Sequence, residues 1–240
     1  MKIEVLSLIL VSLFVGLPGC IFDNAFDCEH GRGEVVEENF ALDDLEGIHL
    51  SIDANVHLTQ GDAGHVTIVA QANMIDELDF RVRSRDLRIG NDRCIRNHEP
   101  IEIYITTPTL RELTVSGSGY VIGEGTWIVQ DLALRVSGSG DIDLDLEADD
   151  VEANISGSGS VTLYGEIDEL EANISGSGDL KAYGAVSNTA DIKISGSGTA
   201  EVTVIDLLIA RISGSGKVYY RGEPAVESKI SGSGKVVNDN

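Results

Sequence analysis

Aromatic residues make up only 5% of the 240-residue chain, and there is a single tryptophan, Trp127. Lysine and arginine are also scarce, at 17 against 40 aspartate and glutamate residues, so the formal net charge is −23. Because nucleic acids and anionic membranes repel a chain this acidic, neither is an expected partner. The shortage of aromatic residues also argues against the substrate platforms that usually line the groove of a sugar-processing enzyme.

Helical periodicity is missing from residues 112–240, which excludes a helical solenoid. After residue 20 no stretch is long and apolar enough to cross a bilayer. Catalytic signatures are missing too, because Gly117-Ser118-Gly119 does not match the G-x-S-x-G nucleophile motif and no helix is expected after it. The glycines lack the strand–turn–helix context of a dinucleotide-binding fingerprint. The sequence therefore predicts no enzymatic activity and no cofactor.

What the sequence has instead is a repeat. Ser-Gly-Ser-Gly occurs seven times, each copy follows a valine or isoleucine, and the starts are 18 to 21 residues apart, at Ser116, Ser137, Ser156, Ser175, Ser195, Ser213 and Ser231. Because one unit of this size cannot bury a face alone, the regular period predicts a solenoid. A flexible linker is the other interpretation of SGSG, but linkers do not recur in phase with flanking apolar residues.

The flanking residues alternate with a period of two, which is typical of strands. Around the first copy Leu113, Val115 and Val121 share one parity, while Thr114 and Tyr120 share the other. We therefore predict an all-β fold, a single right-handed parallel β-helix with about 18–21 residues per turn. The glycines are expected inside each corner, where a side chain would clash or a positive φ is required. The serines are expected to stack outward in two columns, with hydroxyls able to bond along the axis.

The first residues read as an export signal. Residues 1–19 hold Lys2 and an apolar run over 5–15, and Cys20 follows directly. This arrangement resembles a bacterial lipoprotein box, in which Cys20 is lipidated and its acyl chains anchor the protein. An ordinary secretory signal cleaved nearby is the alternative. Residues 20–33 are then a tether, 34–111 the irregular N-terminal turns that cap the β-helix, and 112–240 the seven repeats.

Two cysteines remain if Cys20 is lipidated. Cys28 and Cys94 form an even pair in an oxidising compartment, which favours a disulfide between them. The alternative is two unrelated thiols, since sequence alone gives no distance between them.

Two sets of side chains were considered as metal ligands. Three histidines are spaced by eight residues, at His49, His57 and His65, and their positions favour solvated strand faces over a metal site. Three aspartates alternate along one strand, at Asp141, Asp143 and Asp145, and carboxylates with this spacing can gather a calcium ion. A plain acidic face explains them as well, so the sequence predicts no metal and leaves these aspartates as a calcium candidate.

Several short motifs are similar to those of the head GIN domain family, whose members are named putative auto-transporter adhesins. They are the lipoprotein box, residues 31–36 (GRGEVV) after Cys28, 59–62 (TQGD), 107–110 (TPTL) before the first SGSG, and 220–224 (YRGEP) before the last. The resemblance covers roughly residues 34–237. It implies a parallel β-helical, envelope-associated protein with no established catalytic activity.

Three functions fit these observations. The first is a non-enzymatic lipoprotein of the bacterial outer membrane, facing the periplasm or the surface, that binds a glycan or an envelope protein through many weak contacts. Its binding column is expected at Ser137, Ser156, Ser175, Ser195 and Ser213. The second is a carbohydrate-active β-helical enzyme, and the third is an envelope polymer that stacks β-helix ends. We favour the first, although fold analogy alone does not choose among them.

Overall fold

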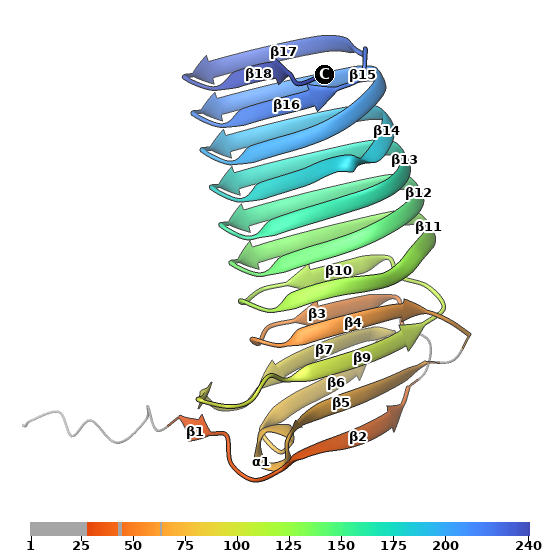
Figure 1. The fold of residues 1–240 in the computed structure, drawn as a ribbon, viewed down its shortest axis with the longest axis vertical. Helices are drawn as coiled ribbons and strands as arrows, with labels where there is room; N and C mark the ends of the chain where they lie inside the picture. Colours follow the sequence, from red (N-terminus) through yellow and green to blue (C-terminus); the bar gives the residue numbers. More distant parts are fainter. Residues whose placement is uncertain (1–27, 43–44, 63) are drawn as a thin grey trace, which may run out of the picture.

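The computed structural model describes residues 28–240 apart from 43, 44 and 63. The expected signal segment, Cys20 and the residues up to 27 lie outside the described part of the chain. The described chain is a parallel β-solenoid whose coils stack along one long axis (Figure 1), which confirms the all-β expectation. Its elements are β1 (Glu29–His30), β2 (Val35–Ala41), β3 (Gly47–Leu50), β4 (Asn55–Gln60), β5 (His65–Gln71), α1 (Ala72–Ile75), β6 (Leu78–Arg83), β7 (Asp86–Asn91), β8 (Ile95–Arg96), β9 (Glu102–Thr107), β10 (Glu112–Val115), β11 (Tyr120–Gly138), β12 (Asp141–Gly157), β13 (Ser160–Gly176), β14 (Asp179–Gly196), β15 (Thr199–Gly214), β16 (Lys217–Arg221), β17 (Ala225–Gly232) and β18 (Lys235–Asn238).

Each regular coil is one long bent strand that ends in an SGSG corner. In β12 the in–out alternation breaks at residues 147–150, where the strand bends, and β12 then runs to Gly157 in the next corner. Successive coils pair in parallel with like residues in register, as Ile155 does with Ile174 and Ile174 with Ile194. These inward isoleucines are 2% exposed or less. Burying each one contributes about 1.5–3 kcal/mol, so the stacked apolar columns are the main source of stability.

The corner requires glycine for two reasons. Gly157 has φ +131°, and a Cβ placed on it would lie 2.3 Å from the carbonyl oxygen of Gly138 in the coil below. That same oxygen accepts a hydrogen bond from the Ser158 N–H at 2.9 Å. The sequence predicted both reasons for glycine, the crowding and the positive φ, but not this backbone hydrogen bond between successive corners. The equivalent glycines, all with φ between 119° and 136°, are Gly138, Gly176, Gly196, Gly214 and Gly232.

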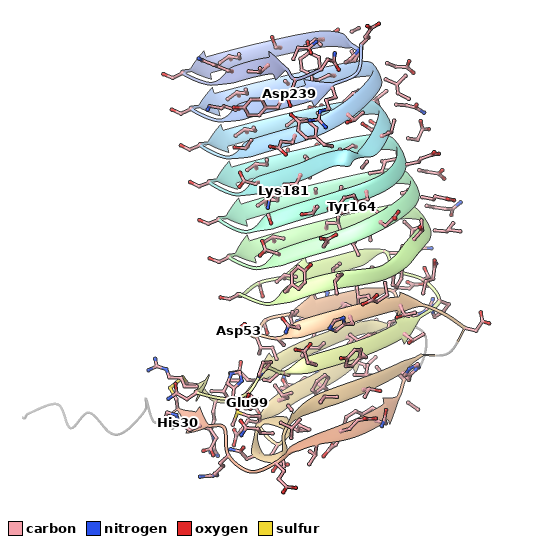
Figure 2. The ribbon with its side chains drawn as sticks, in the orientation of Figure 1. His30, Asp53, Glu99, Tyr164, Lys181 and Asp239 are labelled. Carbon is pink, nitrogen blue, oxygen red and sulfur yellow. A yellow bond between two sulfur atoms is a disulfide. The ribbon has the colours of Figure 1, made fainter. Side chains whose placement is uncertain are left out.

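The coil beneath the first SGSG corner comes from an earlier part of the chain. β10 pairs with β3 and β11 pairs with β4, while β7 and β9 lie on the other side of the β3–β4 coil. The corner between β3 and β4 is Ser51-Ile52-Asp53-Ala54, and Asp53 lies at the same edge of the solenoid as the SGSG corners (Figure 2). This corner takes the place of SGSG without either glycine.

Antiparallel strands close the N-terminal end. β5 pairs antiparallel with β2 and β9, and β6 pairs antiparallel with β7. The one-turn helix α1 buries Met74 and Ile75 against the core. Residues 34–111 therefore combine the parallel strands β3, β4, β7 and β9 with antiparallel pairs at the N-terminal end. Among the described residues no helix has the length and apolar character needed to cross a membrane.

A disulfide fixes the start of the described chain to this cap. Cys28 and Cys94 are bonded to each other, with their Cα atoms 4.5 Å apart. Beside the disulfide β1 pairs in parallel with β8. The favoured disulfide is thus present, and it ties the end of the predicted tether to the cap.

Candidate functional site: the serine ladder

The first serine of each SGSG corner stands in a column that we call the serine ladder. From Ser137 onward each of these serines pairs in register with the serine of the next coil. The members of the serine ladder are Ser137, Ser156, Ser175, Ser195, Ser213 and Ser231, and all are exposed. Within the described residues their hydroxyls take part in none of the side-chain hydrogen bonds, so the expected bonding along the axis does not form. The ladder therefore presents a free donor and acceptor about every 4.8 Å.

A second column runs parallel to the serine ladder, two residues earlier in each coil. Its members face outward in register and each carries a side-chain hydrogen-bond donor: Thr114, Arg135, Asn154, Asn173, Lys193, Arg211 and Lys229. We call it the donor column. Along the last coils a shallow groove of about 410 Å³ runs between the two columns, over the backbone at Ile174, Ile194 and Ile212.

Carboxylates balance the charge of the donor column. Lys193 Nζ lies 2.8 Å from Glu171, and Arg211 Nη1 lies 2.5 and 2.7 Å from the two oxygens of Asp191. The hydrogen bond from Lys193 lowers the pKa of Glu171, and the same bond raises the pKa of Lys193. The groove is therefore locally close to neutral on a chain whose net charge is −23.

The structure brings the five expected serines into one column, but the groove covers only part of it. Ser175, Ser195 and Ser213 line the groove together with Ser231, which is not among the five predicted serines. Ser137 and Ser156 continue the ladder beyond the groove. The donor column was also missed, although its two-residue offset from each SGSG is visible in the sequence.

The three aspartates of the calcium candidate have separate roles. Asp141 Oδ1 accepts hydrogen bonds from the N–H and the hydroxyl of Ser160 in the next coil, at 2.9 and 2.6 Å. Burial raises the pKa of the Asp143 carboxyl, and the nearby Lys181, labelled in Figure 2, opposes that shift. No group of three or more His, Cys, Asp or Glu side chains in the described chain is placed to hold a metal ion. Asp141 thus joins two neighbouring coils.

The three histidines lie on three successive strands, β3, β4 and β5. His57 stacks on Tyr104 with ring centroids 4.7 Å apart, and its two ring nitrogens contact Glu102 and Glu124 at 3.1 and 3.2 Å. His65 contacts the Thr106 hydroxyl at 3.3 Å. The partners of His57 and His65 are thus side chains of other strands.

A second, larger groove of about 810 Å³ follows the bend opposite the SGSG corners, from β11 to β15. Carboxylates line it, with Glu147 directly in register with Glu166, next to exposed aliphatic side chains such as Ile128, which is 66% exposed. None of its lining residues is aromatic. Trp127 is fully buried, so its ring cannot serve as a platform for a sugar. This groove was not predicted from the sequence, although an isoleucine at an outward strand position, Ile128, indicates an apolar surface there.

Comparison with known proteins agrees with the fold. A family model described as "Putative auto-transporter adhesin, head GIN domain" matches residues 44–224. None of the curated proteins matches the chain. A crystal structure of a "putative adhesin" from Bacteroides fragilis superimposes with a TM-score of 0.84 at 21% identity, over 88% of this chain and 99% of that one. A "putative adhesin" and a "Putative lipid binding protein" from Parabacteroides distasonis give TM-scores of 0.72 and 0.76 at 26% and 24% identity, each over 88% of this chain and 99% of the other.

Proposed function

Because the chain belongs to the head GIN domain family of putative auto-transporter adhesins, we propose that it is a lipid-anchored, non-enzymatic binding protein of the bacterial cell envelope. The serine ladder and the donor column hold an extended neutral glycan between them. The observation that carries this proposal is the groove between the two columns, which repeats the same free hydroxyl in every coil it crosses. The family itself supports an adhesin-like protein of the envelope or surface.

The chemistry of the groove suits a long, repetitive, uncharged partner. Each hydroxyl contact contributes only about 0.5–1.5 kcal/mol, so affinity has to come from many contacts along one chain or from many copies. The ion pairs of Lys193 and Arg211 leave little net charge to attract an anion, and the acidic remainder of the protein repels one. Binding should therefore depend weakly on salt, since few counterions are released.

The first prediction tests the serine ladder. Replacing Ser137, Ser156, Ser175, Ser195 and Ser213 together with alanine is expected to abolish binding to neutral polysaccharides and to whole cells, because the hydroxyls are the repeated contact. Unfolding should change little, since these side chains are exposed and make no hydrogen bonds within the described protein. Binding is measured on immobilised polysaccharides, and folding by circular dichroism.

The matched control for the serine ladder changes the second serine of the same five corners. These residues are also exposed but do not line the groove: Ser139, Ser158, Ser177, Ser197 and Ser215. Their replacement with alanine should leave binding intact. If both variants bind like the unchanged protein, the serines belong only to the corner architecture and the proposed site is wrong.

The second prediction tests the anchor. Cys20→Ser is expected to move the protein from the membrane fraction to the soluble fraction and to stop signal processing at Gly19, because the acylated sulfur is lost. Fractionation of cells followed by immunoblotting measures both effects. Cys28→Ser is the control, since it removes a cysteine from the disulfide and leaves Cys20 in place. A Cys20→Ser protein that stays with the membrane would contradict lipidation.

A carbohydrate-active enzyme is the competing function, and the carboxylate-lined groove is where it would have to act. Glycoside hydrolysis needs two carboxyl groups on either side of a bound sugar. Glu147 and Glu166 lie in register on adjacent strands of one surface, which places them side by side at the spacing of neighbouring strands. Release of reducing sugar from any of the polysaccharides that bind would refute the non-enzymatic proposal.

A further inference from the structure

The C-terminal end of the solenoid has unpaired strand edges in the described chain. β17 pairs only with β15 and β18 only with β16, so in the described chain one edge of each strand has no partner (upper end of Figure 1). Val226 and Ile230 continue the inward columns of Leu208 and Ile212, which are at most 2% exposed, yet they are 39% and 43% exposed themselves.

At the opposite end β2 and β6 also have one unpaired edge in the described chain, since β2 pairs only with β5 and β6 only with β7. The inward side chains of β5 and α1, including Val66, Ile68 and Met74, are at most 1% exposed because the antiparallel cap covers them. Phe40 and Val82 continue the inward positions of Val66 and Leu87 at that end, and they are 41% and 43% exposed. Uncovered apolar side chains thus occur at both ends of the described chain, and those at the C-terminal end lie on β17. This end offers both an apolar surface and unpaired backbone groups, the two features that lead edge strands to associate.

Charge also distinguishes this end from the rest of the protein. Residues 225–240 carry two acidic and two basic side chains, whereas the whole chain has a net charge of −23. Glu227 and Lys229 form none of the ion pairs of the described chain. Ile209 occupies the position that Glu171 and Asp191 hold in earlier coils, so Lys229 has no carboxylate below it. Two copies can therefore approach here without the repulsion that acidic bodies otherwise exert on each other.

We propose that the C-terminal end binds a second copy of the same chain, with the two β17 strands antiparallel about a two-fold axis at Ser228. The sequence of β17, AVESKISG, is self-complementary in this register. Glu227 lies opposite Lys229 of the second copy, and Val226 lies opposite Ile230 of the second copy. The contact continues the apolar core across the junction and satisfies the backbone groups of both edges. It is an isologous contact, which closes at two copies and cannot grow into a filament.

This contact is separate from glycan binding in the groove, because its partner is a second copy of the chain. It also has a consequence for adhesion. The N-terminal segments of the two copies lie at opposite ends of the paired rod. If Cys20 is the lipid anchor, the pair connects two facing membranes. This consequence rests on the proposed function. The pairing itself depends on neither the anchor nor the glycan. Lysines on an edge strand can also serve only to prevent association, and the experiment separates these two roles.

The experiment measures self-association of the full chain in detergent by sedimentation velocity over a concentration series. The unchanged protein should form dimers and nothing larger. Glu227→Lys places two lysines opposite two lysines, and Lys229→Glu places glutamates opposite glutamates. Each variant should dimerise about tenfold or more weakly, because two favourable cross-strand pairs become repulsive. An equimolar mixture of the two variants should recover a mixed dimer, and the double exchange Glu227→Lys with Lys229→Glu should recover the homodimer.

Recovery by both complementary combinations is the expected result, and it is independent of any effect of one substitution on folding. Three outcomes would overturn the proposal. The unchanged protein stays monomeric at all concentrations, the single variants dimerise as well as it does, or neither the mixture nor the double exchange recovers association. The serine-ladder variant should dimerise normally, so loss of glycan binding and loss of pairing are separate results.

Discussion

Ile174→Asp is expected to destabilise the protein by about 4 kcal/mol or more. Ile174 lies in the middle of the inward column of isoleucines and is 2% exposed. The substitution removes a buried aliphatic side chain and places a carboxylate where no polar group is available to pair with it. Because each coil contacts only its neighbours, the central coils should open first.

Chemical denaturation followed by circular dichroism measures this loss. Ser175→Asp is the matched control, since it places the same carboxylate one residue later on an exposed side chain. It should unfold within about 0.5 kcal/mol of the unchanged protein, as surface substitutions usually do. Equal stability of the two variants would contradict the inward assignment of this column.

Gly157→Ala is expected to cost about 3 kcal/mol or more. At φ +131° an alanine is strained, and its Cβ would lie 2.3 Å from the Gly138 carbonyl oxygen. The backbone strain alone costs about 1–3 kcal/mol, and displacing the oxygen weakens its hydrogen bond with Ser158. The same denaturation measurement applies.

Gly125→Ala separates strain from crowding. Gly125 also has a positive φ, +76°, but nothing lies within 4 Å of the position of an added Cβ. Its replacement should cost only about 1 kcal/mol, the usual penalty for a side chain in the left-handed region. If Gly157→Ala costs no more than Gly125→Ala, contact between corners does not explain the glycine of the repeat.

The repeats could be predicted from the sequence because their signals are local. The alternation of apolar and polar residues around Val115 and Ile174 identifies the side chains that face inward. The near-constant spacing of SGSG gives the length of one coil. The groove could be predicted only in part, because Lys193 is in register with Asn173 and reaches Glu171 diagonally on the neighbouring coil. The ion pair between Lys193 and Glu171 depends on that stacking.

The N-terminal part was harder because its contacts are not local. In the corner at Ser51, Ile52 and Ala54 occupy the places of the two glycines, so no motif marks it. Nothing in the sequence around Glu112 indicates that it lies beside Gly47 rather than beside the strand just before it. The antiparallel cap and α1 were missed for the same reason. The disulfide between Cys28 and Cys94 could be predicted from the sequence, because only these two cysteines remain if Cys20 is lipidated.

The stacking order of the coils has a consequence for how the chain acquires its structure. Glu112 pairs with Gly47, 65 positions earlier, whereas each corner from Ser137 onward stacks on a corner only 18 to 21 positions before it. The entropy of loop closure is thus concentrated in the contacts made by residues that leave the ribosome first. Once β3 and β4 are in place, every later coil meets a finished template directly behind it. We therefore expect coils to be added from the N-terminal end toward the C-terminal end, in the direction of synthesis.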